Sequence, residues 1–179
     1  SMQCCVQDIQ SESDGLWVAS DRGMKFFSYS DGRFYPCSLT SGIKEENMAT
    51  SICKLVRDEK GLFALDWRGR ICKHVGQREF AVCFDGIDTF YGFASYKPGL
   101  LIASGANGLW LLSADSGKVV SHLAYHSVVM SYRTTVYYDK HNDVGYVGYG
   151  IGFKSITFRI VGNEIRRVDS EGCVPDNLM

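Results

Sequence analysis

The chain has 179 residues, of which 45% are hydrophobic and 22% are charged, and its formal net charge at pH 7 is −1. This composition predicts a folded domain with an apolar core, and the near-zero charge gives no electrostatic footprint for nucleic acid or an anionic membrane. No apolar run approaches the roughly 18 residues that a transmembrane helix needs, and no signal peptide is visible. We therefore expect neither nucleic-acid binding nor direct membrane contact from this segment.

The seven cysteines are odd in number and include no Cys-x-x-Cys pair, so the usual zinc and thioredoxin-like motifs are excluded. Most of them lie in apolar contexts typical of strands, such as Val82-Cys83-Phe84. A chain of this size does not need disulfides to hold a fold together. The sequence therefore predicts buried free thiols that behave as small hydrophobic side chains.

A sequence pattern recurs about every 45 residues along the chain, and it predicts the fold class. Each copy has a turn that carries glycine, a stiff apolar strand, a second glycine turn and another strand. The four copies begin at Asp14, Lys60, Pro98 and Asp143. A period of about 40–50 residues with four strands in each unit is the signature of a β-propeller blade. We therefore expect an all-β chain of about four blades, each an antiparallel four-stranded sheet.

The predicted units follow one another along a single propeller segment, residues 1–179. The four repeats cover about residues 5–38, 49–84, 89–125 and 127–170. Between the first and second repeats, residues 39–48 are expected to form a polar loop, because the helical stretch at 45–49 is too short to stand alone. Residues 171–179 resemble the start of a linker to a further blade, so we expect this chain to be a fragment of a larger propeller.

Within the units, the expected strands are separated by short turns rich in Asp, Asn and Gly. In the first unit they lie near residues 5–10, 16–20, 24–29 and 33–38. In the second they lie near 50–57, 62–66, 70–75 and 79–84. In the third they lie near 90–96, 100–104, 109–113 and 118–125, and in the fourth near 128–138, 144–149, 153–161 and 164–169.

The motif Asp14-Gly15-Leu16-Trp17, followed by Asp21-Arg22-Gly23-Met24, resembles the two-component regulator propeller repeat. Arg57-Asp58-Glu59-Lys60-Gly61-Leu62-Phe63 supplies the same Asp-x-x-Gly turn in the second unit. The chain departs from the repeat at Phe63, Ile102 and Tyr146, where tryptophan is usual. Such repeats occur in tandem in the extracytoplasmic sensor regions of Bacteroides-type hybrid two-component histidine kinases.

The resemblance implies a non-enzymatic, carbohydrate-responsive sensor segment in the periplasm, in a membrane-anchored parent whose histidine kinase lies elsewhere. An oligosaccharide is then the expected ligand, and the open blade faces of a four-blade piece are expected to favour self-association. The alternative is an intracellular, cytoplasmic scaffold propeller that binds another protein, which free cysteines favour because reducing compartments tolerate them. Against this alternative, the Gly-His and Trp-Asp dipeptides of common WD-type blades are missing.

No motif in the sequence predicts catalysis, a cofactor or a metal. His122 and His126 are four residues apart, but on a strand that spacing separates them by roughly 13 Å. The acidic residues lie mainly in turns, where aspartate bonds to backbone amides. Gly148-Tyr149-Gly150-Ile151-Gly152 is rich in glycine, but no helix follows it to form a phosphate cradle.

The candidate ligand-binding residues come from propeller geometry, in which the turns between second and third strands gather on one face with the connections between blades. Those turns carry the candidate residues Arg22, Trp67, Arg68, Asn107 and Tyr149. An exposed Trp67 can stack on a sugar ring, while Arg68 can pair with a carboxylate. The alternative is that Trp67 packs against the neighbouring blade and Arg68 is merely solvated.

Overall fold

The protein is described by a computed structural model that covers residues 4–41, 44–48, 51–125, 134–149 and 154–168. All eighteen regular elements within these ranges are β-strands, so the all-β prediction is confirmed. The strands form four sheets, and the four predicted repeats correspond to one sheet each. Sheets 1 to 4 are numbered here in chain order.

Sheets 1, 3 and 4 are antiparallel and have four strands that are adjacent in chain order. Sheet 1 contains β1 (Val6–Ser11), β2 (Gly15–Ser20), β3 (Gly23–Ser28) and β4 (Phe34–Pro36). Sheet 3 contains β11 (Phe90–Lys97), β12 (Leu100–Gly105), β13 (Gly108–Ser113) and β14 (Lys118–Ala124). Sheet 4 contains β15 (Thr135–Asp139), β16 (Val144–Tyr149), β17 (Lys154–Val161) and β18 (Glu164–Arg167). The first part of the predicted strand 128–138 and the glycine-rich turn at 150–152 lie outside the described residues.

Sheet 2 is larger than predicted, because it has six strands in the order β6-β5-β10-β9-β8-β7. Four of them form the expected blade: β7 (Ile52–Asp58), β8 (Gly61–Asp66), β9 (Ile71–Gly76) and β10 (Glu79–Phe84). The other two are β5 (Ser38–Ser41) and β6 (Lys44–Asn47), which pair with each other and extend the sheet through parallel pairing of β5 with β10.

The prediction of a polar loop over residues 39–48 is therefore wrong. Leu39 and Met48 are both buried in the core between sheets 1 and 2, so this segment is anchored by apolar side chains at both ends. Without β5, the backbone groups along the outer edge of β10 would have no strand partner, and parallel pairing with β5 supplies one. Few residues in this stretch are apolar, which hides its strand character in the sequence.

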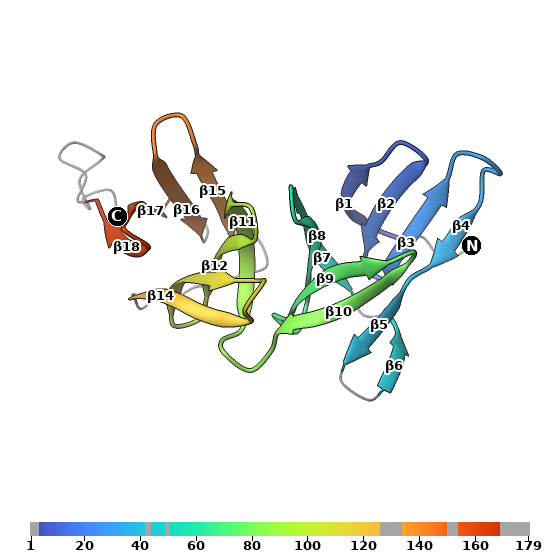
Figure 1. Ribbon diagram of the computed structural model, residues 1–179, viewed down its shortest axis with the longest axis horizontal. Coiled ribbons are helices and arrows are strands. Elements are labelled where there is room, and N and C mark those ends of the chain that lie inside the picture. Colours follow the sequence, from blue (N-terminus) through green and yellow to red (C-terminus); the bar gives the residue numbers. More distant parts are fainter. Residues whose placement is uncertain (1–3, 42–43, 49–50, 126–133, 150–153, 169–179) are drawn as a thin grey trace.

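The four sheets stand in a row with their first strands side by side. β1 contacts β7, β7 contacts β11, and β11 contacts β15. Figure 1 shows sheet 1, with the N-terminus, at one end of this row and sheet 4, with the C-terminus, at the other. The row is thus open between its first and last sheets, as expected of several consecutive propeller blades.

The apolar core is divided among the three junctions between neighbouring sheets. Strand β8 shows why, because its successive side chains point to opposite faces. Leu62 and Ala64 pack into the junction with sheet 1, whereas Phe63 and Leu65 pack into the junction with sheet 3. A strand that is buried on both faces needs a continuous apolar run, which is the pattern that recurs in the sequence.

Candidate functional site

The structure places the predicted turns beside the connections between sheets, as propeller geometry requires. The amide of Trp67 donates to the carbonyl of Ser51 at 2.9 Å, in the connection before β7. The amide of Ala106 donates to the carbonyl of Thr89 at 3.2 Å, in the connection before β11. These turns and connections therefore share one end of the sheets, called the turn face below.

The turn that carries Trp67 and Arg68 is built on the carboxylate of Asp66, which is 1% exposed. Its Oδ1 accepts hydrogen bonds from the amides of Arg68 at 3.0 Å and Arg70 at 2.9 Å. Its Oδ2 accepts one from Nε of Arg70 at 2.7 Å. Burial by itself lowers the pKa of Arg70, but the hydrogen bond and charge of Asp66 raise that pKa overall. Arg70 therefore keeps its charge, and its hydrogen bonds to Asp66 fix the turn.

The two predicted recognition residues of this turn point into solvent. Trp67 keeps 48% of its surface exposed, so about half of its side chain is accessible to a ligand. Arg68 is exposed as well. The turn itself is held against sheet 3, because a Cβ on Gly69 would lie only 2.5 Å from the backbone nitrogen of Phe90. Trp67 and Arg68 are thus exposed side chains on a rigid turn.

The other three predicted site residues, Arg22, Asn107 and Tyr149, differ in their exposure and hydrogen bonding. Arg22 is exposed in the turn between β2 and β3. Asn107 is exposed too, but its Nδ2 donates to Oδ1 of Asp88 at 3.1 Å and its amide donates to Oδ2 of Asp88 at 2.9 Å. Its carboxamide therefore helps to shape its own turn. Tyr149 ends β16, and its side chain lies outside the described residues.

The structure brings some of these turns close together. The turn at Gly69 abuts the backbone of Thr89 and Phe90, and the turn at Asn107 is bonded to Asp88, next to them. The Trp67 and Asn107 turns therefore flank one connection between sheets 2 and 3. Together they form a surface of exposed polar and aromatic groups.

The sequence did not reveal a pocket of about 630 Å³ between sheets 1 and 2, at the end opposite the turn face. The turn between β1 and β2 forms one wall, and the turn between β9 and β10 forms the other. The lining residues are Glu12, Ser13, Asp14, Trp17, Phe26, His74, Gln77 and Arg78. A second pocket, of about 440 Å³, shares Gln77 and Arg78 with it.

Trp17 forms the floor of the pocket, where a hydrogen bond and aromatic contacts hold its indole ring. Its Nε1 donates to Oε2 of Glu12 at 2.5 Å, and Oε1 of Glu12 accepts from Nη2 of Arg57 at 2.6 Å. The ring centroid of Trp17 lies 4.8 Å from that of Phe26 and 4.7 Å from that of His74. Such tilted and edge-on aromatic contacts are favourable. Trp17 and Glu12 therefore form a rigid floor at the bottom of the pocket.

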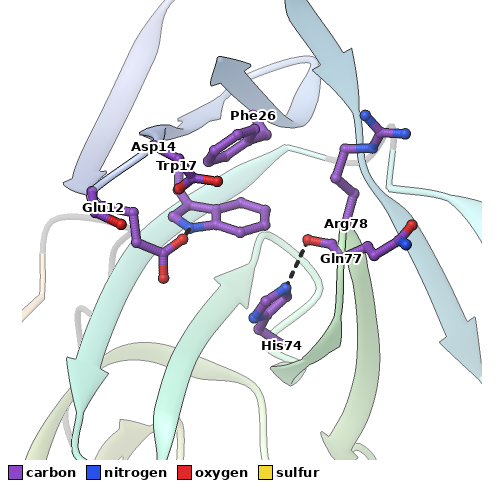
Figure 2. Close-up of a pocket in the computed structure, with 8 residues that line it drawn as sticks. Glu12, Asp14, Trp17, Phe26, His74, Gln77 and Arg78 are labelled. Carbon is purple, nitrogen blue, oxygen red and sulfur yellow. Dashed lines mark hydrogen bonds between the residues drawn. The ribbon is translucent and has the colours of Figure 1, made fainter. Parts of the chain in front are cut away.

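The wall formed by sheet 2 carries hydrogen-bond donors and a cation. Figure 2 shows His74, Gln77 and Arg78 across from Glu12 and Asp14, with Trp17 between the two groups. Nε2 of His74 lies 3.0 Å from the carbonyl of Gln77 and donates to it, which closes the turn. The guanidinium of Arg78 lies 4.6 Å from the ring centroid of Tyr35. The pocket thus has carboxylates on one wall and a guanidinium on the other.

This pocket could not be predicted from one segment of the sequence. Asp14 and Trp17 belong to the motif that marks the first repeat, but that motif serves the fold in every unit. The pocket exists because the β1–β2 turn packs beside the β9–β10 turn, and these lie about 60 residues apart in the chain. The only hint in the sequence is that the β1–β2 turn is acidic, whereas the β9–β10 turn carries Gln77 and Arg78.

The described part of the chain has no group of three or more His, Cys, Asp or Glu side chains that could hold a metal ion. Nor does any helix in these ranges have the length and apolar character needed to cross a membrane. Turn formation is the observed role of several acids, as predicted from the sequence. Asp139, for example, accepts from the amides of His141 at 2.9 Å and Asn142 at 3.2 Å.

Three solved structures of known proteins have the same arrangement of sheets. U3-55K matches 93% of this chain with 52% of its own, at a TM-score of 0.66 and 12% identity. The computationally designed protein Ika8 matches 93% of this chain with 49% of its own, at a TM-score of 0.62 and 14% identity. The extracellular domain of BT4673 from B. thetaiotaomicron, assigned to a hybrid two-component system, matches 90% with 22% of its own, at 0.61 and 15%.

These likenesses define the class of fold, a row of β-propeller blades, as predicted from the repeats. At such low identities they speak for the fold alone. The chain spans about half the length of U3-55K and of Ika8. No protein-family model matches the sequence, and no curated protein matches it as a relative.

Proposed function

We propose that this chain is a non-enzymatic recognition segment of a bacterial two-component sensor, and that it binds a saccharide in the pocket between sheets 1 and 2. The observation that carries the proposal is the pocket of about 630 Å³ with a fixed aromatic floor and polar groups on both walls. The fold shared with the extracellular domain of BT4673 supports the sensor class and a periplasmic location.

The chemistry of the pocket suits a saccharide. The apolar faces of a sugar ring pack against aromatic side chains, and the accessible ring here is that of half-buried Phe26, because Trp17 is only 2% exposed. Sugar hydroxyls both donate and accept hydrogen bonds, so the carboxylate of Asp14 and the guanidinium of Arg78 can each bind one. A neutral, polyhydroxylated ligand would use both walls, whereas a simple anion or cation would meet a like charge on one of them.

The pocket supports binding better than catalysis. A general acid or base needs a carboxyl group that can exchange its proton with the substrate. Glu12 accepts hydrogen bonds from both Trp17 and Arg57, so its two oxygens are committed to holding the floor. Asp14 lies in an exposed turn. We therefore expect the ligand to be bound and released unchanged.

The test is a screen of oligosaccharides against the purified protein, followed by isothermal titration of those that bind. Arg78→Ala and Asp14→Asn should each weaken binding about tenfold, which corresponds to about 1.4 kcal/mol. The matched controls are Arg166→Ala and Asp115→Asn, both exposed and far along the chain. If Arg68→Ala weakens binding while Arg78→Ala does not, the ligand site is the turn face. Failure of every saccharide to bind would contradict the proposal.

A second candidate function is a protein-binding scaffold in a reducing compartment. The observation that favours it is that all six described cysteines, Cys4, Cys5, Cys37, Cys53, Cys72 and Cys83, are free. An oxidising periplasm would be expected to act on the exposed thiols of Cys4 and Cys5. The test is to express the protein in a periplasm and measure the redox state of Cys4 and Cys5. If both thiols stay reduced in the native protein, the free cysteines no longer argue against a periplasmic sensor.

A further inference from the structure

A second pocket adjoins the first one at the turn between β9 and β10. It measures about 440 Å³, against about 630 Å³ for the first, and both volumes are typical of ligand sites, which span roughly 300–1,000 Å³. Its lining residues are Pro36, Cys37, Ser38, Gly76, Gln77, Arg78 and Glu79. Since Gln77 and Arg78 line both pockets, the tip of this turn is a wall that the two pockets share.

The tip of the turn is held in a strained conformation. It consists of Gln77 and Arg78, and Gln77 has a φ of 37°, a positive value that favours glycine. Two hydrogen bonds hold it: His74 Nε2 donates to the carbonyl of Gln77 at 3.0 Å (Figure 2), and the amide of Ser38 donates to the carbonyl of Arg78 at 3.0 Å. Backbone strain of this kind clusters at ligand sites. Glycine would relieve it, whereas glutamine brings a carboxamide that donates and accepts hydrogen bonds.

Arg78 is positioned at the border between the two pockets. Its guanidinium lies 4.6 Å from the ring centroid of Tyr35, which is close enough for a cation–π contact. The side chain is nevertheless exposed. A guanidinium carries five N–H donors in a planar fork, so this one group can donate to ligand atoms on both sides of the turn.

The second pocket offers polar groups of the same kinds as the first. Glu79 is exposed, and its Oε1 accepts a hydrogen bond from the hydroxyl of Thr40. Ser38 adds a hydroxyl that can both donate and accept, and Arg78 adds donors. The described lining of this pocket includes no aromatic side chain, so its contacts with a ligand are mainly hydrogen bonds. Such a lining suits the hydroxyl groups of a sugar.

We propose that the two pockets are adjacent subsites of one groove, and that the groove recognises an oligosaccharide in preference to a single sugar. One unit lies against Phe26 in the first pocket, and a further unit binds Ser38 and Glu79 in the second. The units between them pass the tip of the turn. This inference rests on the proposed function, since it names the class of saccharide. Because linked units bind as one molecule, contacts in the second pocket add affinity that a monosaccharide cannot obtain.

The experiment is isothermal titration of the intact chain with glucose, xylose and mannose, and with the trisaccharide and hexasaccharide of each. For the sugar that binds, the hexasaccharide should bind about tenfold more tightly than the monosaccharide. Gly76→Phe fills the second pocket, because Gly76 lines it and a Cβ there meets no described atom within 4 Å. This variant should lose the tenfold difference while its affinity for the monosaccharide is unchanged.

Val75→Phe is the matched control, because it adds the same ring one residue earlier in β9, where Val75 is 55% exposed and lines neither pocket. It should keep the tenfold difference. If Gly76→Phe does not fold, Ser38→Ala takes its place, because it deletes only a hydroxyl of the second pocket. It should weaken binding of the hexasaccharide alone, by about threefold.

The outcomes separate this inference from the proposed function. Equal affinities for the monosaccharide and the hexasaccharide would overturn the groove and leave saccharide binding in the first pocket intact. A Gly76→Phe variant that keeps the tenfold difference, with circular dichroism showing a native fold, would also overturn the groove. Failure of every saccharide to bind would contradict the proposed function, and this inference with it.

Discussion

Trp17 and Trp67 are the same residue type in two different structural settings. Trp67 is 48% exposed on a turn that one short segment builds, with Asp66 bonded to the amides that follow it. Trp17 is 2% exposed and forms the floor of a pocket whose two walls come from different sheets. The exposed tryptophan could be found by local reasoning about turns. The pocket needs tertiary packing, and we infer that it is the better ligand site.

The largest expected difference between the two tryptophans is in stability. Trp17→Ala should lower the free energy of unfolding by about 3–5 kcal/mol, because it leaves a cavity among Phe26, His74 and Phe80. Trp67→Ala should lower it by only about 1 kcal/mol, since 48% of that side chain is already exposed. Denaturant unfolding of both variants measures these values. Equal losses would contradict the distinction between a buried floor and an exposed side chain.

A second prediction concerns what holds Trp67 in place. Asp66→Asn should destabilise the protein by about 3 kcal/mol, because it leaves the buried charge of Arg70 without its partner. Replacing Asp66 and Arg70 together by neutral residues should recover part of this loss. Asp115→Asn removes an exposed partner of Lys60 and should cost about 0.5 kcal/mol or less. A loss for Asp66→Asn as small as that for Asp115→Asn would show that the pair does not fix the turn.

A third prediction concerns the single hydrogen bond that joins Trp17 to Glu12 in the pocket. Trp17→Phe keeps an aromatic floor but deletes the bond from Nε1 to Glu12, and a bond to a charged group contributes about 1.5–3 kcal/mol. We expect a stability loss of about 2 kcal/mol and weaker ligand binding, because Glu12 is no longer fixed. Trp110→Phe, which deletes the bond from Nε1 of Trp110 to Asp88, is the control for stability without the pocket. If both variants bind ligand equally well, Trp17 is not part of the site.

The smallest effect expected is on thiol chemistry. Burial raises the pKa of Cys37 and of Cys72 to about 12, so neither is a thiolate near pH 8. Cys4 and Cys5 are exposed at the other end of sheet 1 from the pocket. A thiol reagent should label Cys4 and Cys5 in the native protein and reach Cys37 and Cys72 only after unfolding. Labelling sites mapped by mass spectrometry check this, and rapid labelling of Cys72 in the native protein would contradict it.

The same shifts set a dependence of stability on pH. A thiol whose pKa is higher in the folded protein than in the unfolded chain binds its proton more tightly when folded. The stability linked to Cys37 and Cys72 is therefore fully present below their ordinary pKa of 9.0 and is lost as pH rises toward 12. Unfolding midpoints measured between these pH values should fall, and serine at both positions should make the fall shallower.

The fold was largely predictable from the sequence because the repeat is local. Glycines in or beside the turns between strands, such as Gly23 and Gly69, adopt positive φ angles that favour glycine, and so they mark the turns. The extra hairpin of β5 and β6 was not predictable, because its buried residues Leu39 and Met48 stand apart in a polar stretch. Its position depends on the edge of β10, which lies about 40 residues further along the chain.

The candidate site was predictable only in part. Turn residues such as Trp67 and Arg68 were found because their exposure follows from the place of one turn in the repeat. The role of Asn107 was missed, since its partner Asp88 lies in a connection 19 residues earlier. The pocket was missed because neither wall is a site without the other.

Binding in the pocket can be observed directly by an NMR titration of the three tryptophan indole N–H signals with a saccharide that binds. Substitution of each tryptophan by phenylalanine assigns the signals of Trp17, Trp67 and Trp110, and Trp110 is the internal control because its Nε1 is bonded to Asp88. We predict that the Trp17 signal shifts with the ligand while the Trp67 signal stays in place. A shift of Trp67 with Trp17 unmoved would contradict the pocket and assign recognition to the turn face.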